Sequence, residues 1–279
     1  MKNNKLLKAL SIVSVSVLSL GMFAGCGTSN STSEVTSNEV DTNQEEVKDN
    51  NTNVKDDNVI IMGTNAEFEP FEYRENGMDI VGFDVEIAEK VAEKMGKELV
   101  IEDMAFDSLI MALNSDKIDF IAAGMTATDE RRTQVDFSES YFHSKQMIIV
   151  KADDTSITTA DDLVGKNVGV QLGTTGDLFV SGTEGIASVA QFQTGTQAVM
   201  DLKNGKVDAV VIDAEPAKKM TEGQSDLKLL DAPFVEEEYA IAVKKGNDEV
   251  LQAINETLTD IQANGTYDEI YAKYFGTAE

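Results

Sequence analysis

An arginine pair and a single aspartate each follow an apolar, strand-like run, where they could bind charged groups. Arg131 and Arg132 lie in AGMTATDERR, in a chain with only 23 lysines and arginines. An arginine can hold a carboxylate through two parallel, charge-assisted hydrogen bonds, and Thr126 could assist with its hydroxyl and amide. Asp213 ends the run AVVID, where an ionised carboxylate is costly unless a cation meets it. Together, Arg131 and Asp213 predict a site for the carboxylate and ammonium groups of an α-amino acid.

Both residues also have simpler explanations. Taken alone, Arg131 is better explained as a surface arginine paired with Asp129 or Glu130. Asp213 could cap a helix that begins in AEP, the next three residues, because aspartate is a preferred cap and proline a preferred first-turn residue. The local motifs therefore leave both roles open.

Aromatic and polar residues follow other strand-like runs. Asn65 and Phe68 lie in TNAEFEPFEY after the first run, and Phe106 lies in MAFDSL. Aromatic faces beside a ligand exclude water and strengthen its polar contacts, although each phenylalanine alone is better explained as core. VGVQLGTTGDLF follows a later run and then begins a helix, so its free amides could also receive a carboxylate. It lacks the lysine of a phosphate-binding loop.

Alternating strands and helices must position these residues. The expected strands are 59–64, 118–124, 146–151, 167–171 and 207–213, and the expected helices are 84–95, 108–114, 160–164 and 196–204. We expect Asp84 to cap the first of these helices and Gly96 to end it. Strands separated by helices indicate parallel sheets with helices on both faces.

One internal similarity predicts two similarly built lobes. LNSDKIDFIAAG ends at Gly124 and LKNGKVDAVVID ends at Asp213, a constant separation of 89 residues. Chance similarity between helix-to-strand units is common, so this pattern favours paired lobes without requiring them. Ligands bind beyond the carboxyl ends of parallel strands, so facing lobes would bring residues 124–126 close to Asp213.

The N-terminal residues predict export and a lipid anchor. Residues 1–25 have a basic start, a short apolar middle and a small-residue exit, which is the layout of a signal peptide. The only cysteine, Cys26, follows in a segment that resembles a bacterial lipobox, except that Phe23 replaces the usual leucine. The alternative is a plain signal peptide that happens to contain a cysteine. A single cysteine also excludes an intramolecular disulfide.

Acidic composition characterises the rest of the chain. Residues 26–58 lack aromatic residues and bury too little to fold, so we expect a lipidated cysteine and a disordered acidic tether, with an acidic binding tail as the alternative. The net charge is −27. Nucleic acids and anionic lipids require dense Lys and Arg, so we expect neither as a partner.

Several motifs in order give residues 59–276 a family resemblance. GTNAEFEPFEY, VGFDVEIA, AAGMTATDERR, VDFS and NGTYDEIYAKYFG resemble the polar amino-acid family of solute-binding proteins of ABC importers. The resemblance implies an α/β, type II periplasmic-binding fold of two lobes, with a parallel-rich sheet in each, two crossover hinge strands and a ligand cleft between the lobes. The implied boundaries are 59–143 with 240–279 for lobe 1, 144–239 for lobe 2, and crossovers near 141–146 and 234–240.

The resemblance implies roles for the charged and hydroxyl residues. Arg131 would clamp the ligand carboxylate, with Thr126 and Thr175 assisting. Asp213 would receive the α-ammonium group, together with the backbone of Gly124.

The resemblance also bears on selectivity. Phe68 and Phe106 would sandwich the ligand. Asn65 occupies a position that is often aspartate in members that bind basic side chains or glutamine, and Gln171 lies where selectivity varies. A basic ligand is not excluded, because Glu67 and other acids could lie nearby. Which amino acid binds is left open.

We therefore expect a monomeric, lipid-anchored receptor on the extracytoplasmic face of a bacterial membrane. It would capture a free polar L-amino acid by lobe closure and deliver it to an ABC permease and its ATPase, with no cofactor and no metal.

Two other classes of function are open alternatives. A lyase or dehydratase on the same scaffold could use Glu67 as general acid, but there is no nucleophile elbow, metal-spaced cluster or dinucleotide fingerprint, and His143, the only histidine, lies at the expected crossover. A sensory ectodomain would need a second membrane span, and no apolar run follows Phe275, which favours a detached receptor.

Overall fold

The structure is a computed structural model, which describes residues 57–233 and 235–276 of the chain. The predictions for the signal peptide, for Cys26 and for all but the end of the tether concern positions outside the described residues. The first strand of the described residues is β1 (Val59–Thr64), which coincides with the first expected strand.

Nine strands form the main sheet of this described part, in the order β5-β1-β6-β12-β7-β10-β8-β9, with β11 paired to β7. The further strands of this sheet are β5 (Glu98–Asp103), β6 (Phe120–Ile121), β7 (Val135–Lys151), β8 (Asn167–Gln171), β9 (Ser188–Phe192), β10 (Ala209–Asp213), β11 (Leu227–Leu229) and β12 (Val235–Lys244). A small antiparallel sheet contains β2 (Glu67–Phe68), β3 (Glu72–Glu75) and β4 (Asp79–Val81).

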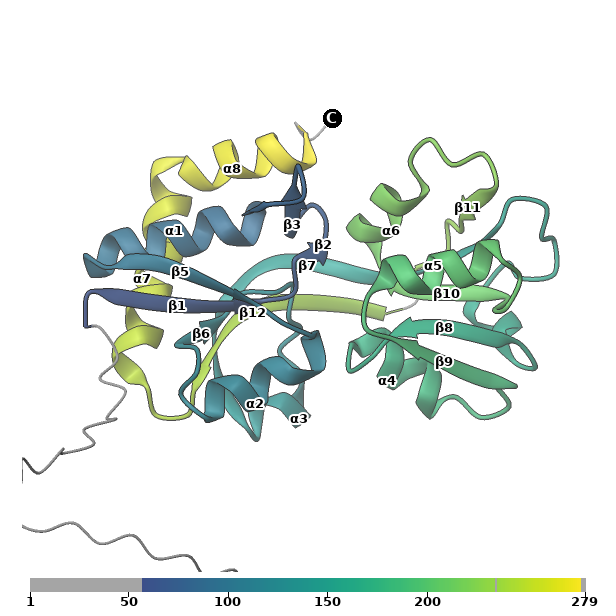
Figure 1. The fold of residues 1–279 in the computed structure, drawn as a ribbon, viewed down its shortest axis with the longest axis horizontal. Helices are drawn as coiled ribbons and strands as arrows, with labels where there is room; N and C mark the ends of the chain where they lie inside the picture. Colours follow the sequence, from purple (N-terminus) through teal and green to yellow (C-terminus); the bar gives the residue numbers. More distant parts are fainter. Residues whose placement is uncertain (1–56, 234, 277–279) are drawn as a thin grey trace, which may run out of the picture. The chain divides into compact units, whose positions relative to one another are not determined.

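Helices separate most of these strands, and Figure 1 shows them on both sides of the main sheet. They are α1 (Phe83–Met95), the 3₁₀ turn η1 (Phe106–Ser108), α2 (Leu109–Asn114), α3 (Asp129–Arg132), the 3₁₀ turn η2 (Ala160–Leu163), α4 (Thr175–Gly182), α5 (Gly195–Lys203), α6 (Ala214–Thr221), α7 (Asp248–Asn264) and α8 (Thr266–Phe275). Among the described residues, none of these helices is both long and apolar enough to cross a membrane.

The parallel strands fall into two groups, which confirms the predicted α/β class. In the first strand group, β5-β1-β6, β1 pairs in parallel with both neighbours. In the second strand group, β10-β8-β9, both pairings are also parallel. Runs such as VIIM and AVVI suit strands that are covered on both faces, because both side-chain directions are then buried.

The helix-to-strand similarity corresponds to a repeated turn. Lys117 N donates to Ala112 O at 3.0 Å, and Lys206 N donates to Asp201 O at 2.9 Å. After each turn an aspartate carboxylate accepts a backbone N–H from the neighbouring strand: Asp119 from Ile61 and Asp208 from Asn167, both at 2.8 Å. The shared Lys-(Ile/Val)-Asp pattern therefore fixes how each returning strand meets its parallel partner.

Two long strands, β7 and β12, pair with each other and run between the two strand groups (Figure 1). Their antiparallel register extends from Val235 opposite Gln146 to Lys244 opposite Val135, with irregularities between Tyr239 and Ala242. The strand expected at 146–151 is only the end of β7, because the preceding residues alternate polar and apolar and lack the continuous apolar run.

Helix α1 starts differently from the prediction. Its N-cap is Gly82, with no side-chain cap, and Asp84 lies inside the first turn. The Asp84 carboxylate is buried and accepts hydrogen bonds from Gly124 N at 2.9 Å and Tyr141 Oη at 2.6 Å. The predicted capping role was therefore wrong, because tertiary partners take the carboxylate. The predicted end is confirmed: Gly96 caps α1 with a left-handed φ of 65°.

An aromatic cluster anchors the long strands to the first strand group's helices. Phe142 of β7 and Tyr239 of β12 have ring centroids 4.8 Å and 5.2 Å from that of Phe71, and the Phe83 and Phe275 rings of α1 and α8 lie 5.1 Å apart. Such aromatic pairs contribute about 0.5–1.5 kcal/mol each beyond the area they bury. The cluster therefore packs the middle of β7 and of β12, where Phe142 and Tyr239 lie, against these helices.

Candidate functional site

All nine residues predicted to contact a ligand line one small cavity. The lining consists of Asn65, Phe68, Glu72, Phe106, Ala123, Gly124, Thr126, Arg131, Gln171, Thr174, Thr175 and Asp213. Asn65, Thr126, Gln171, Thr174, Thr175 and Asp213 lie at or just beyond the carboxyl ends of β1, β6, β8 and β10, whereas Arg131 lies in α3 and Glu72 begins β3. The structure therefore brings the nine predicted residues together, while the part that each residue plays in binding stays a prediction.

Arg131 is buried in this cavity, and its guanidinium bridges the two strand groups. Nη1 donates to Thr126 O at 2.7 Å, and Nη2 donates to Gly173 O, in the turn after β8, at 2.9 Å. The guanidinium carbon also lies 5.2 Å from the ring centroid of Phe106. Each terminal nitrogen has two N–H groups, so one on each is free of these carbonyls and can face a carboxylate.

The surface-arginine alternative does not describe Arg131. It is 6% exposed, and its guanidinium donates to the carbonyls of Thr126 and Gly173 rather than to Asp129 or Glu130. Burial lowers the pKa of Arg131, whereas the carboxylates of Glu237 and Asp213 oppose that change. The cavity thus contains a desolvated cation.

Asp213 supplies the opposite charge at the end of β10. It stands at the N-cap position of α6, but its side chain makes no capping hydrogen bond there. Its Oδ1 instead accepts a short hydrogen bond from the Tyr239 hydroxyl. Burial, and then the negative charge of Glu237, raise the pKa of Asp213 well above its ordinary value. A cationic ligand group would therefore stabilise the ionised form.

Gly124 is needed at the end of β6 for two steric reasons. Its φ of 52° is strained for any residue with a side chain, and a Cβ atom there would lie 2.7 Å from a ring carbon of Phe68. Its N–H is held by Asp84, so the backbone here is fixed by a buried carboxylate beneath the cavity.

A second polar contact joins the strand groups. Gln171 Nε2 donates to Asn65 Oδ1 at 2.9 Å and to Gln193 O at 3.3 Å, while Asn65 Nδ2 donates to Met104 O at 2.9 Å. Both amide side chains are buried. Their mutual hydrogen bond closes one wall of the cavity.

Glu72 lines the cavity and was missed by the sequence analysis. It is 1% exposed, and neither carboxylate oxygen has a hydrogen-bond partner. Burial, and then the neighbouring charge of Asp84, raise the pKa of Glu72 well above its ordinary value. An acid in the middle of the aromatic motif FEPFEY was the available signal, since charged residues rarely share a strand with buried rings unless they have a function.

The cavity is small because the surrounding side chains are in contact. Its volume is about 10 Å³, roughly the space that one water needs. Admitting an amino acid requires the contacts of Arg131 with Gly173 and of Asn65 with Gln171 to separate.

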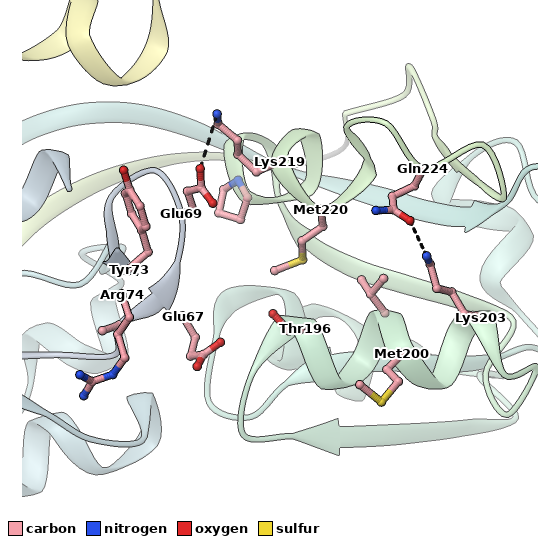
Figure 2. Close-up of a pocket in the computed structure, with 13 residues that line it drawn as sticks. Glu67, Glu69, Tyr73, Arg74, Thr196, Met200, Lys203, Lys219, Met220 and Gln224 are labelled. Carbon is pink, nitrogen blue, oxygen red and sulfur yellow. Dashed lines mark hydrogen bonds and ion pairs between the residues drawn. The ribbon is translucent and has the colours of Figure 1, made fainter. Parts of the chain in front are cut away.

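A separate, larger cavity of about 510 Å³ is shown in Figure 2. Glu67 and Glu69 line it from the β2–β3 hairpin, and Lys219 of α6 approaches Glu69 at 3.6 Å. Glu67, the candidate general acid of the enzyme alternative, is exposed there and does not line the small cavity. Within residues 57–233 and 235–276, no His, Cys, Asp or Glu cluster suits a metal ion.

Known proteins resemble the chain over the whole described region. The family model described as "Bacterial extracellular solute-binding proteins, family 3" matches residues 60–277. The arginine-binding extracellular protein ArtP of Bacillus subtilis is 38% identical over 77% of this chain and 86% of its own length. The L-cystine-binding protein TcyJ of Escherichia coli is 30% identical over 78% and 82%.

A solved structure agrees with the sequence relatives. An ancestral arginine-binding protein bound to glutamine is 42% identical, with a TM-score of 0.76, and the match covers 79% of this chain and 99% of that one.

Proposed function

We propose that this chain, which belongs to family 3 of the bacterial extracellular solute-binding proteins, captures a free amino acid and delivers it to an ABC-type importer. The fold is the two-lobed, type II periplasmic-binding α/β fold of that family. Members of the family bind solutes and are not enzymes, so the lyase or dehydratase alternative is set aside.

The observation that carries the proposal is the pairing of opposite charges in one cavity. Arg131 and Asp213 are both buried and both line it. A free α-amino acid presents a carboxylate and an ammonium group on one carbon, so it complements both at once. Thr126, Thr175 and the backbone of Gly124 would complete these contacts, and Phe68 and Phe106 would cover the ligand.

Lobe closure would assemble this site. We assign residues 59–143 and 240–279 to lobe 1 and residues 144–239 to lobe 2, with the two crossings in β7 and β12 as hinge. Arg131 and Asn65 in lobe 1 then contact Gly173 and Gln171 in lobe 2. A transporter can distinguish closed from open lobes, because closure juxtaposes surfaces from both.

The buried charges favour an amino acid with a cationic side chain, and arginine is the proposed ligand. Around the cavity Glu72, Asp84, Asp213 and Glu237 are buried, against Arg131 as the one buried cation among the described residues. Because Glu72 has no hydrogen-bond partner, a guanidinium or ammonium group would gain a charge-assisted hydrogen bond and relieve an uncompensated acid. ArtP, which is named for arginine binding, supports this choice.

A ligand panel tests the proposal. Isothermal titration calorimetry with arginine, lysine, histidine, glutamine and cystine should give the tightest binding for arginine. Glu72→Gln should weaken arginine binding at least tenfold and change glutamine binding much less, since only the cationic side chain needs the charge. Glu67→Gln is the matched control, because Glu67 is exposed and lines the larger cavity instead. Absence of binding to every amino acid would refute the function, whereas equal losses for arginine and glutamine would refute only the role of Glu72.

The proposed location is the extracytoplasmic face of the bacterial membrane, where the monomer would be held by a lipid on Cys26. The extracellular family and the lipobox-like sequence that ends at Cys26 support this. Cys26→Ser should release the protein from membranes of the producing cells, as followed by fractionation. Continued membrane association of that variant would contradict the anchor.

A further inference from the structure

Glu237 is a buried carboxylate on the crossing strand β12, between the two strand groups. It is 5% exposed, whereas its neighbours Glu236 and Glu238 are exposed. Its Oε1 has no hydrogen-bond partner. Glu237 does not line the small cavity, so it acts on a ligand only through the residues that it contacts.

Those contacts connect the two threonines predicted to bind the ligand carboxylate. The Thr126 hydroxyl donates to Glu237 Oε2 at 3.0 Å. Gln146 Nε2, on β7, donates to the same oxygen and to Thr175 Oγ1, each at 3.2 Å. One chain of hydrogen bonds therefore runs from Thr126 after β6, through both crossing strands, to Thr175 at the start of α4.

Glu237 also faces Asp213. Gln146 lies opposite Asp213 in the pairing of β10 with β7, and it donates to Glu237. The Tyr239 hydroxyl, two residues along β12, donates to Asp213. Two buried carboxylates are thus held against the same neighbours.

We propose that Glu237 is a positioning residue of the ligand site, which aligns the Thr126 and Thr175 hydroxyls through the crossing strands. This inference rests on the proposed amino-acid receptor.

The charged and titratable groups around Asp213 shift its pKa in different directions. The negative charge of Glu237 raises the pKa of Asp213 after burial, while the Tyr239 hydroxyl lowers it. Arg131 feels the charges of both Glu237 and Asp213, and Glu72 feels that of Asp213.

Titration calorimetry compares two variants of the same strand. Glu237→Gln should weaken arginine binding about tenfold or more. Glu236→Gln, on the exposed side of the strand, should match the wild type.

A double-mutant cycle tests the positioning. Thr126→Val should weaken arginine binding in the wild-type background and much less in Glu237→Gln, because the hydroxyl is then no longer aligned. Additive losses would overturn the positioning role.

The failures of the two proposals can be told apart. Unchanged arginine affinity in Glu237→Gln overturns the positioning role and leaves the receptor function intact. No binding of any amino acid by the wild-type protein overturns both.

Discussion

The surroundings of Arg131 in the structure, and not its sequence motif, identify it as a candidate binding residue. In the sequence it is one of two adjacent arginines beside two acids, which is a common surface arrangement. In the structure its guanidinium is desolvated and bonded to Thr126 O and Gly173 O, while Arg132 lies exposed with its guanidinium carbon 5.3 Å from the ring centroid of Phe137. The pair thus separates into a binding residue and a surface residue.

Arg131→Ala should remove most amino-acid binding. A ligand carboxylate buried without its cation typically costs about 3–5 kcal/mol, which corresponds to a loss of a hundredfold or more in affinity. Arg132→Ala is the matched control and should change affinity less than threefold. Titration calorimetry with the best ligand decides, and unchanged affinity in Arg131→Ala would remove this residue from the site.

Gly124→Ala should destabilise the protein and weaken binding. The new Cβ would lie 2.7 Å from a Phe68 ring carbon in a backbone with φ of 52°, and backbone strain alone costs about 1–3 kcal/mol. Gly246→Ala has similar backbone strain, with φ of 77° and no atom within 4 Å of its Cβ. Thermal unfolding should show both variants destabilised. Calorimetry should show weaker binding only for Gly124→Ala. Equal binding by the two variants would contradict an effect of the Phe68 contact on the ligand site.

At the scale of elements, sequence patterns located the strand ends but did not identify the buried acids Glu72 and Glu237. All nine candidate residues line one cavity, and several of them follow apolar runs that form parallel strands, at whose carboxyl ends ligands collect. Glu72 and Glu237 were missed, since both lie within strands that alternate. In VEEEYAIAV, period-two alternation puts Glu237 on the same face as Val235 and Tyr239, and that was the available signal.

The β2–β3 hairpin and α6 meet through one ion pair, Glu69 with Lys219 at 3.6 Å. Exposed ion pairs contribute about 0–1 kcal/mol, so we expect Lys219→Ala to weaken binding by less than about fivefold. Lys218→Ala, which breaks a pair with Glu215 inside α6, is the control and should leave affinity unchanged. Affinities measured at low and high salt test this, and a loss far above fivefold would make the hairpin contact a main determinant of closure.

For the whole molecule, the two strand groups were foreseeable and the continuous sheet was not. The repeated helix-to-strand unit predicted the two groups, and its shared Lys and Asp make equivalent contacts in both. The 17-residue strand β7 was predicted only at its apolar end. Its register with β12 depends on pairing between distant residues, which local periodicity does not encode.

Buried acids should give the whole fold an unusual pH dependence. Burial raises the pKa of Asp84 from 3.8 to about 6, although hydrogen bonds from Tyr141 and Gly124 N oppose the change. The folded state therefore binds the proton more tightly than the unfolded state, and this residue lowers the free energy of unfolding as pH rises from about 4 to about 6. Asp84→Asn should lose that part of the slope, so its stability relative to wild type should improve across this interval.

Asp136→Asn should change the pH dependence of stability in the opposite direction. The Gly246 N–H and Lys245 lower the pKa of Asp136, so the stability that this carboxylate contributes is present at neutral pH and lost as pH falls through the acid range. Urea unfolding at several pH values distinguishes the two variants. A pH-independent difference between Asp84→Asn and wild type would contradict the raised pKa.

The late position of β12 has a consequence for the order in which the fold can form. β6 pairs with β1 and with β12, and Ile241 of β12 bonds Ser138 of β7 across 103 positions of sequence. Helix α1 likewise packs against α7 and α8, the last two helices. Such high contact order slows folding, because long loops must close before their contacts form. A chain that emerges N-terminus first therefore cannot complete this sheet or cover α1 until residues 235–275 have followed.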